Sequence, residues 1–511
     1  MRNCGHARLL LFCACAMFFL NGCRRATPDD PNTVTILIES SPTSLDPRVG
    51  VDAQSEHIDM LLFDALVKKD ARFNLQPDLA ASWEIPDPLT YIFHLRDGVV
   101  FHNGQPLTSR DVQWTLDTMR NGTLITPKAS ALASIASIET PDAHTVVLHL
   151  QHADASLLWN LSDGSTGIVP YGSGKDFQQH PIGTGSFRFV RQEVDKEVVL
   201  ERNPSAWDGV PAIHQLRFEV VPDAMTRALE LRKGSADIAI NAFPADMTWS
   251  LRRDPQLVIA SVPGNNVQYL TLNLRDPYLR HLRVRQAIAT AINRPLIIQA
   301  LLRGEARPAN SLLPPGHWAY SENTPDIAYD PARARQLLQQ AGFAPDHEGI
   351  RFHLSMKTST DETARLLAMV LQQQLRQVGI ALDIQSYEFA TFYSDISQGR
   401  FGMYSLRWIG GNEDPDIFRY ALATASAPPH GANRGFYSNA AVDALISQAQ
   451  QEVNIKDRRV AYAQVQQILA RDLPVIPLWY VDSVVVYNRR LAGIAPSPSG
   501  TFDFLRHVAI R

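Results

Sequence analysis

The sequence predicts an α/β fold, and the chain is long enough for about three domains or lobes. Of its 511 residues, 45% are hydrophobic and 20% are charged, which is the balance of an ordinary soluble globular protein. Short strands and polar turns dominate residues 73–181, whereas helical and strand patterns alternate after about Tyr269. The alternation predicts an α/β lobe with mainly parallel strands, and the strand-rich stretch predicts an inserted lobe.

Residues 1–22 have the features of a cleaved secretory signal that precedes a lipid anchor. Two arginines flank the start of the chain, and the apolar run Leu9–Leu20 is only 12 residues long, too short to cross a hydrocarbon core of about 30 Å. The residues Leu20-Asn21-Gly22-Cys23 resemble a bacterial lipobox, in which the Cys23 thiol takes a diacylglycerol. An ordinary signal with an incidental cysteine is the alternative. We expect lipidation at Cys23 and a location in the periplasm or cell envelope.

Cysteine content and charge exclude several classes of protein. All four cysteines lie within residues 1–23, so the remainder of the chain has no disulfide framework, thiolate metal site or cysteine nucleophile. Without the two leader arginines the chain has 46 basic and 52 acidic residues, a net charge of −6, which argues against nucleic acid as a partner. Leu9–Leu20 is the one long apolar stretch, so we expect a tethered protein.

The elements of the first part of the chain follow from local patterns. Residues 23–32 are polar, contain two prolines and predict a tether. The apolar, β-branched run VTILI (34–38) predicts a buried strand that ends at the turn residues Ser40 and Ser41. Further on, Thr108 and Asp111 have the spacing of a capping box and predict the start of a helix.

In the later part of the chain, helices are expected to lead into strands. Asp330-Pro331 starts a helix that Gly342 ends. An apolar stripe over 366–378 predicts a helix before an alternating strand from Ile380, and a second helix precedes the apolar run 474–488. The final segment, FDFLRHVAIR (502–511), is expected to return to the first lobe as an edge strand.

Sequence patterns of catalysis are absent. The chain has no Gly-x-Ser-x-Gly elbow, no His-Glu-x-x-His and no Walker loop. His102, His144, His149 and His152 have spacings that suit neither a helical nor a hairpin metal site. We therefore expect no enzyme activity, no metal site and no cofactor.

Eight segments in a fixed order carry a family resemblance. They are SLDP (44–47), LQPDLAASWE (75–84), FHLRDGVVFHNGQPLTSRDV (93–112), PIGTGSFRF (181–189), RNPSAWDG (202–209), VRQAIATAINR (284–294), YDPARARQLLQQAGF (329–343) and RWIGGNEDPDIF (407–418). The chain resembles the bacterial family 5 extracellular solute-binding proteins, the dipeptide- and oligopeptide-binding receptors of ATP-driven importers. The resemblance implies a periplasmic-binding-protein-like, two-lobed clamp with an extra inserted domain, of the cluster C type.

The resemblance also implies a division of the chain. The expected parts are a signal peptide (1–22), a tether (23–32), lobe I (33–72, 183–268 and 482–511), inserted domain II (73–182) and lobe III (269–481). A ligand is then enclosed between lobes I and III of a monomer, and the permease and ATPase of an ABC importer recognise the closed form. Gly183 and Gly185 fit a backbone crossing between lobes.

The segment RWIGGNEDPDIF implies a departure from the family's pattern. In the family, the corresponding tryptophan lies at the cleft, and an acidic residue three positions later holds the ligand's α-ammonium group. Here Trp408 is followed at that position by Gly411, which has no carboxylate. Glu413, Asp414 and Asp416 follow within five residues and can substitute only if the loop is rearranged, whereas Asp414-Pro415 also fits a loop-to-helix junction with Asp416 near the helix start. We therefore expect a ligand whose anchoring does not require a free amine.

The ligand-binding residues expected from the resemblance come from two parts of the chain. They are Glu39, Ser40 and Ser41 on lobe I, and Tyr269, Tyr404, Arg407, Trp408, Gly411, Asn412 and Asp414 on lobe III. Burial in a core is an alternative explanation for Tyr269 and Tyr404.

Several functions fit this sequence. The first is an importer's receptor for a peptide or peptide-like solute. A receptor for a sugar or a metal chelate is an alternative. His430, in the loop after the Trp408 segment, supports the metal-chelate alternative. A sensory binding protein needs the same clamp, and a secreted enzyme has least support.

Overall fold

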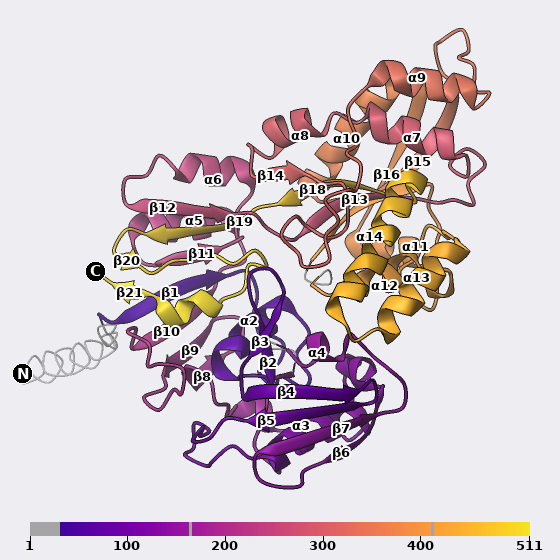
Figure 1. Ribbon diagram of the computed structural model, residues 1–511. Helices are drawn as coiled ribbons and strands as arrows, with labels where there is room; N and C mark the ends of the chain where they lie inside the picture. Colours follow the sequence, from indigo (N-terminus) through magenta and orange to yellow (C-terminus); the bar gives the residue numbers. More distant parts are fainter. Residues whose placement is uncertain (1–30, 163–165, 410–412) are drawn as a thin grey trace, which may run out of the picture.

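The computed structural model describes residues 31–162, 166–409 and 413–511, and Figure 1 shows two large sheets with a smaller one below them. The sequence prediction of an α/β protein is confirmed. The leader with Cys23, as well as Gly411 and Asn412, lies outside the described residues. Within the described ranges, no helix has both the length and the apolar character needed to cross a membrane.

A seven-stranded sheet contains the first strand of the protein. Its order is β12-β19-β11-β1-β10-β9-β8, with β1 (Thr33–Ile38), β8 (Phe187–Glu193), β9 (Glu197–Arg202), β10 (Gln215–Val220), β11 (Ile238–Ile240), β12 (Leu257–Val262) and β19 (Ser483–Asn488). All six residues of β1 are buried, which confirms the strand predicted from VTILI. β1 is parallel to β10 and β11, so the carboxyl ends of these three strands meet at one edge. The helices α2 (Ala53–Leu62), α5 (Ala224–Lys233) and α6 (Ala245–Leu251) belong to this part.

A four-stranded antiparallel unit is inserted between α2 and β8. The order is β4-β5-β7-β6, with β4 (Ala80–Asp87), β5 (Thr90–Leu95), β6 (Ile135–Glu139) and β7 (Thr145–Leu150). The unit also carries α3 (Ser109–Arg120) and α4 (Leu157–Asn160), and a small hairpin of β2 (Val67–Lys69) and β3 (Leu75–Pro77) precedes it. The capping box predicted for α3 is confirmed, because the Thr108 backbone N–H donates to Asp111 Oδ2 at 2.7 Å. We call this unit, α4 included, the inserted domain.

The chain returns from the inserted domain through Gly183 and Gly185. A Cβ on Gly183 would lie 1.9 Å from the Leu62 carbonyl oxygen, and one on Gly185 would lie 2.5 Å from that of Leu61. Close backbone approach, rather than a left-handed conformation, therefore requires glycine at both positions.

The third sheet has six strands in the order β14-β18-β13-β17-β15-β16. Its strands are β13 (Val267–Leu272), β14 (Ala306–Pro308), β15 (Phe352–Ser359), β16 (Ile380–Tyr387), β17 (Met403–Trp408) and β18 (Val475–Val481). The prediction of mainly parallel strands is wrong here, because only β15 with β16 and β15 with β17 pair in parallel. The other three pairs are antiparallel, since β13 and β18 enter the sheet from the opposite lobe rather than through helical crossovers.

Eight α-helices accompany the six-stranded sheet among the described residues. They are α7 (Leu282–Ala291), α8 (Arg294–Leu301), α9 (Pro331–Gln340), α10 (Glu362–Arg376), α11 (Phe389–Ser397), α12 (Ile417–Leu422), α13 (Ala440–Gln451) and α14 (Ile455–Asp472). The predicted ends of α9 are confirmed: Asp330 accepts from the Arg333 N–H as the N-cap, and Gly342 has a φ of 88°. The predicted passage from α10 into a strand is confirmed as well.

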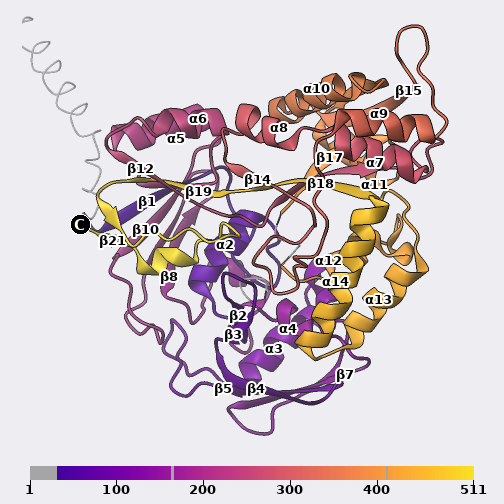
Figure 2. The same cartoon turned by 45° about the horizontal axis from the view of Figure 1, so that its top comes forward.

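The two large sheets are joined by a two-stranded ribbon. β12 pairs with β19 in one sheet, and their continuations β13 and β18 pair in the other. Asp482 alone separates β18 from β19, so the predicted run 474–488 is two strands in two sheets (Figure 2). On the other crossing, a Cβ on Gly264 would lie 2.1 Å from the Val481 carbonyl oxygen. The two crossings are thus in direct backbone contact.

The C-terminal segment returns to the seven-stranded sheet, but the predicted edge strand is wrong. Asp503–His507 form a 3-10 turn, and β21 (Ala509–Ile510) pairs only with β20 (Leu491–Ala492). Phe502 stacks on Phe218 with ring centroids 5.7 Å apart. Burial of aromatic side chains in the core, rather than strand pairing, therefore holds this segment in place.

Candidate functional site

Five of the expected site residues lie at the carboxyl ends of strands in the two large sheets, whereas Tyr269 and Tyr404 lie near the starts of β13 and β17. Glu39, Ser40 and Ser41 directly follow β1, whereas Arg407 and Trp408 end β17. In open α/β sheets, ligands bind outside the carboxyl ends of the strands. These two edges are therefore the candidate site.

At the carboxyl ends of β1, β10 and β11, the seven-stranded sheet carries polar side chains, and Arg227 holds the loops there in place. This buried guanidinium donates to three backbone carbonyls in the loops after β10 and β11, and its Nη2 lies 3.4 Å from Glu39 Oε1. Burial lowers the pKa of Arg227, and Glu39 opposes this effect. The Glu39 side chain is nevertheless 57% exposed, and Ser41 Oγ accepts from the Asp195 N–H at 2.6 Å. Glu39 and Ser40 can therefore still reach a ligand.

On the six-stranded sheet, three expected aromatic residues come together. Tyr269, Tyr404 and Trp408 project from one face of β13 and β17, where Tyr269 lies 6.2 Å from Tyr404 and 6.1 Å from Trp408 between ring centroids. They line one pocket of about 360 Å³, a volume that includes its mouth. Tyr269 and Tyr404 are almost fully buried, so each of them is a core residue and also lines the pocket. Burial raises the pKa of Tyr269, which keeps its hydroxyl protonated.

The pocket has polar residues that sequence reasoning missed. Thr271, Asn433, Arg434 and Tyr437 line it, and the Arg434 guanidinium donates to Tyr393 Oη at 2.9 Å. Thr271 was within reach of the sequence analysis, because it lies two positions after Tyr269 on the same strand face. The other three lie in the irregular segment before α13, and no local pattern marks them.

Arg407 lies on the opposite face of β17 from the pocket. Adjacent residues of a strand point to opposite faces, so Arg407 is separated from Trp408 and Tyr404. Its side chain is exposed and has no hydrogen bond or ion pair among the described residues. Surrounding protein nevertheless lowers the pKa of Arg407 by desolvation. Arg407 is thus a cation available to a ligand, but outside the aromatic pocket.

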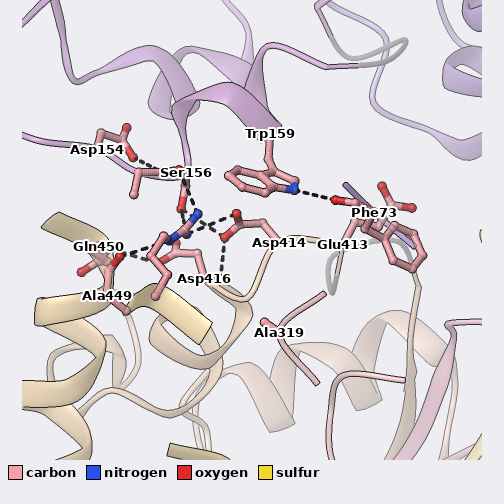
Figure 3. Close-up of polar contacts among 12 residues, drawn as sticks. Phe73, Asp154, Ser156, Trp159, Ala319, Glu413, Asp414, Asp416, Ala449 and Gln450 are labelled. Carbon is pink, nitrogen blue, oxygen red and sulfur yellow. Dashed lines mark hydrogen bonds and ion pairs between the residues drawn. The ribbon is translucent and has the colours of Figure 1, made fainter. Parts of the chain in front are cut away.

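The acids that follow Trp408 are all engaged. Glu413 Oε2 accepts from Lys69 Nζ at 2.6 Å, and Asp416 is paired with Arg419. Asp414 Oδ1 accepts from Ser156 Oγ at 3.1 Å (Figure 3). Burial raises the pKa of Asp416 to about 6. Asp416 occupies the N-cap position of α12, without a side-chain capping bond, so the loop-to-helix interpretation of this segment is confirmed.

The structure does not join the two edges by direct contact. Within the described ranges, no hydrogen bond or ion pair links Glu39, Ser40 or Ser41 to the expected residues of the six-stranded sheet. His430 is exposed and does not line the pocket. The site therefore consists of two separate surfaces.

His317 supports the same loop and has a pH-dependent effect. Its Nε2 donates to the Glu413 carbonyl at 2.9 Å, and its Nδ1 accepts from the Ala319 N–H at 3.0 Å, so the ring is neutral when both bonds form. Burial lowers the pKa of His317 from 6.5 to about 4.

We predict that acid destabilises the protein through His317. Between pH 6.5 and about 4 the unfolded state binds the extra proton, so stability falls as pH falls. From pH 7 to pH 5 this residue should contribute a loss of about 2 kcal/mol, which His317→Gln should lack. Urea unfolding of both proteins at the two pH values measures the difference. Equal losses would show that His317 does not titrate in this range.

Comparison with known proteins was made by sequence and by fold. The family model for bacterial extracellular solute-binding proteins, family 5 Middle, matches residues 74–428. The chain is 31% identical over 501 residues to Di/tripeptide-binding protein 1 of Pseudomonas aeruginosa, covering 91% of this chain and 92% of that protein.

Two solved structures have the same fold with different ligands. DppA from Helicobacter pylori in complex with the peptide STSA has a TM-score of 0.75 and 26% identity, covering 94% of this chain and 98% of that one. NikZ from Campylobacter jejuni in complex with Ni(L-His) has a TM-score of 0.78 and 25% identity, covering 94% and 100%.

Proposed function

Because the chain belongs to family 5 of the bacterial extracellular solute-binding proteins, we propose that it is the lipid-anchored substrate-binding protein of an ABC importer. It captures a peptide or peptide-like solute and delivers it, as a monomer, to a cognate permease and ATPase. The observation that carries this proposal is the aromatic pocket on one face of β13 and β17, in the sheet that a two-stranded ribbon joins to the sheet with the polar residues after β1.

Two lobes joined by a ribbon work by closure. In this proposal lobe I comprises 33–72, 183–268 and 482–511, domain II comprises 73–182, and lobe III comprises 269–481. A solute that touches both lobes binds the closed form more tightly, and that difference in affinity sets how far the population shifts. The permease then recognises the closed shape.

Each edge has a part in solute binding. Tyr269, Tyr404 and Trp408 hold an apolar part of the solute, and their polar ends supply hydrogen bonds. Glu39, Ser40 and Ser41 face the solute from lobe I. The Arg407 guanidinium binds an anionic group of the solute.

The experiment that tests this proposal is mass spectrometry of small molecules released from protein purified without denaturant. A peptide or an amide-containing solute in near-equimolar amount is the expected result. A nickel chelate or a sugar would replace the peptide proposal with one of the alternatives, and a covalently altered product would indicate an enzyme.

We predict that a free amino terminus is not needed for binding. Gly411 replaces the acid that anchors the amine in the family, and Glu413 and Asp414 are already engaged with Lys69 and Ser156. Burying an ammonium group without a partner is costly. In calorimetry, N-acetylated trialanine should therefore bind at least as tightly as trialanine. Tight binding of trialanine that N-acetylation abolishes would contradict this and point to Glu413 or Asp414 as the anchor.

We also predict that Cys23→Ser abolishes the membrane anchor, because serine lacks the thiol that receives the diacylglycerol. The parent protein should enter the detergent phase in Triton X-114 partitioning, and the variant should stay in the aqueous phase. Equal partitioning of the two proteins would place the anchor elsewhere.

A further inference from the structure

The segment 413–416, which leads into α12, is fastened to the inserted domain. Asp414 Oδ1 accepts both from Ser156 Oγ at 3.1 Å and from the Asp416 backbone N–H at 2.7 Å. Ser156 precedes α4 of the inserted domain, whereas Asp414 follows the solute-binding Trp408 by six positions. Figure 3 shows Asp414 beside Ser156 and Asp416, between the two parts of the protein.

Arg458 of α14 closes this junction. Its Nη1 donates to the Ala155 carbonyl at 3.0 Å and its Nε to the Ala449 carbonyl at 3.2 Å, while Nη2 lies 3.5 Å from both Asp414 Oδ2 and Ser156 Oγ. One side chain thus contacts α13, the inserted domain and the loop. The Arg458 side chain is 1% exposed, so water offers it no alternative partner.

Aromatic rings enclose the guanidinium. Its central carbon lies 4.9 Å from the ring centroid of Trp159, 5.3 Å from that of Trp318 and 5.7 Å from that of Tyr462. Trp159 belongs to the inserted domain, and the other two rings come from the part of the chain that carries the six-stranded sheet. A planar cation between aromatic faces and a carboxylate has one favourable orientation, so this contact fixes geometry as well as charge.

We propose that Arg458 is a positioning residue for solute binding, acting through Asp414, and that it makes the inserted domain a support of residues 413–416, which lead into α12, whose Ala421 and Leu422 line the pocket. This inference rests on the proposed function for the identity of the loop. It predicts that the order of residues 413–418 depends on a contact with a separate domain. Neither Arg458 nor Ser156 touches the aromatic pocket, so the effect is indirect.

Hydrogen exchange of the dialysed protein, with no solute added, tests this proposal. The Ala155 N–H donates to the Gln450 carbonyl across the junction, and the Asp416 N–H donates to Asp414, so both amides report on it. In Arg458→Met, exchange in residues 413–418 and 155–161 should be at least about tenfold faster, while β1 and β10 stay protected. If Arg458→Met fails to fold, two milder variants replace it: Asp414→Asn removes the negative charge that faces Arg458, and Ser156→Ala removes the hydroxyl that donates to Asp414. Each should accelerate the same two segments by about threefold.

A matched control is Arg506→Met, which removes a mostly buried, ion-paired arginine beside the seven-stranded sheet. It should leave both reporter segments unchanged. The proposal is overturned if Arg458→Met accelerates exchange only within α14, or equally throughout the chain, because Arg458 would then be an ordinary core residue. Since no solute is used, this result stands apart from the mass spectrometry that tests the proposed function.

Discussion

Replacing Trp408 by alanine is expected to weaken solute binding by about 2 kcal/mol or more, roughly 30-fold, because a central aromatic side chain dominates the energy of such a contact. Trp408 is only partly buried in the protein, and it packs edge-on against Tyr420 at 6.0 Å as well as against Tyr269. Trp408 lines the pocket. The loss should therefore fall on binding and little on the melting temperature.

Calorimetry with the solute recovered from the purified protein measures this loss, and thermal unfolding measures stability. Trp249→Ala is the matched control, because Trp249 is 45% exposed on α6 and does not line the pocket. That variant should bind as the parent does. Early unfolding of Trp408→Ala with unchanged affinity would make Trp408 a core residue instead.

The second large effect is expected at the ribbon. Gly264→Ala places a Cβ 2.1 Å from the Val481 carbonyl oxygen, a backbone atom that cannot rotate away. The two crossings would have to separate, and overpacking of this kind costs about 3 kcal/mol. We expect the variant to unfold at clearly lower urea concentration than the parent.

Gly174→Ala is the control for this substitution, since a Cβ there meets no heavy atom within 4 Å and its φ is not in the left-handed region. It should unfold as the parent does. If the two variants have the same urea midpoint, then the crossings have room to move apart, and the close contact does not constrain the ribbon.

Local signals account for what the sequence predicted well. Asp330 and Gly342 mark the ends of α9, and Thr108 with Asp111 marks the start of α3, because capping depends on residues within one turn of each other. Sheet neighbours depend on distant residues instead. The apolar run 474–488 carries no local signal of its two sheet partners, although the lobe boundary that the family resemblance implies, at 481/482, falls at Asp482, where the run passes from one sheet to the other.

The site was predictable to the same extent. Tyr269, Tyr404 and Trp408 share a pocket, and strand alternation alone places Arg407 on the other face. The partners that occupy the acids of the loop were beyond prediction: Lys69 lies 344 positions from Glu413, and Ser156 lies 258 from Asp414. Sequence periodicity gives no information on contacts between residues so far apart in the chain.

The ribbon also limits how the two large lobes can move. The inserted domain also contacts the part that carries the six-stranded sheet, at Arg458 and Asp414. When that contact separates, the lobes remain attached at two touching strands, so rotation about the ribbon is the soft motion and sliding strains both strands together. In the proposed function, opening and closing of the lobes is then one hinge rotation about the ribbon. Under the proposed function, the transporter would recognise the angle between the two lobes rather than the solute itself. Solutes with different side chains that bring the lobes to the same angle would therefore be recognised alike.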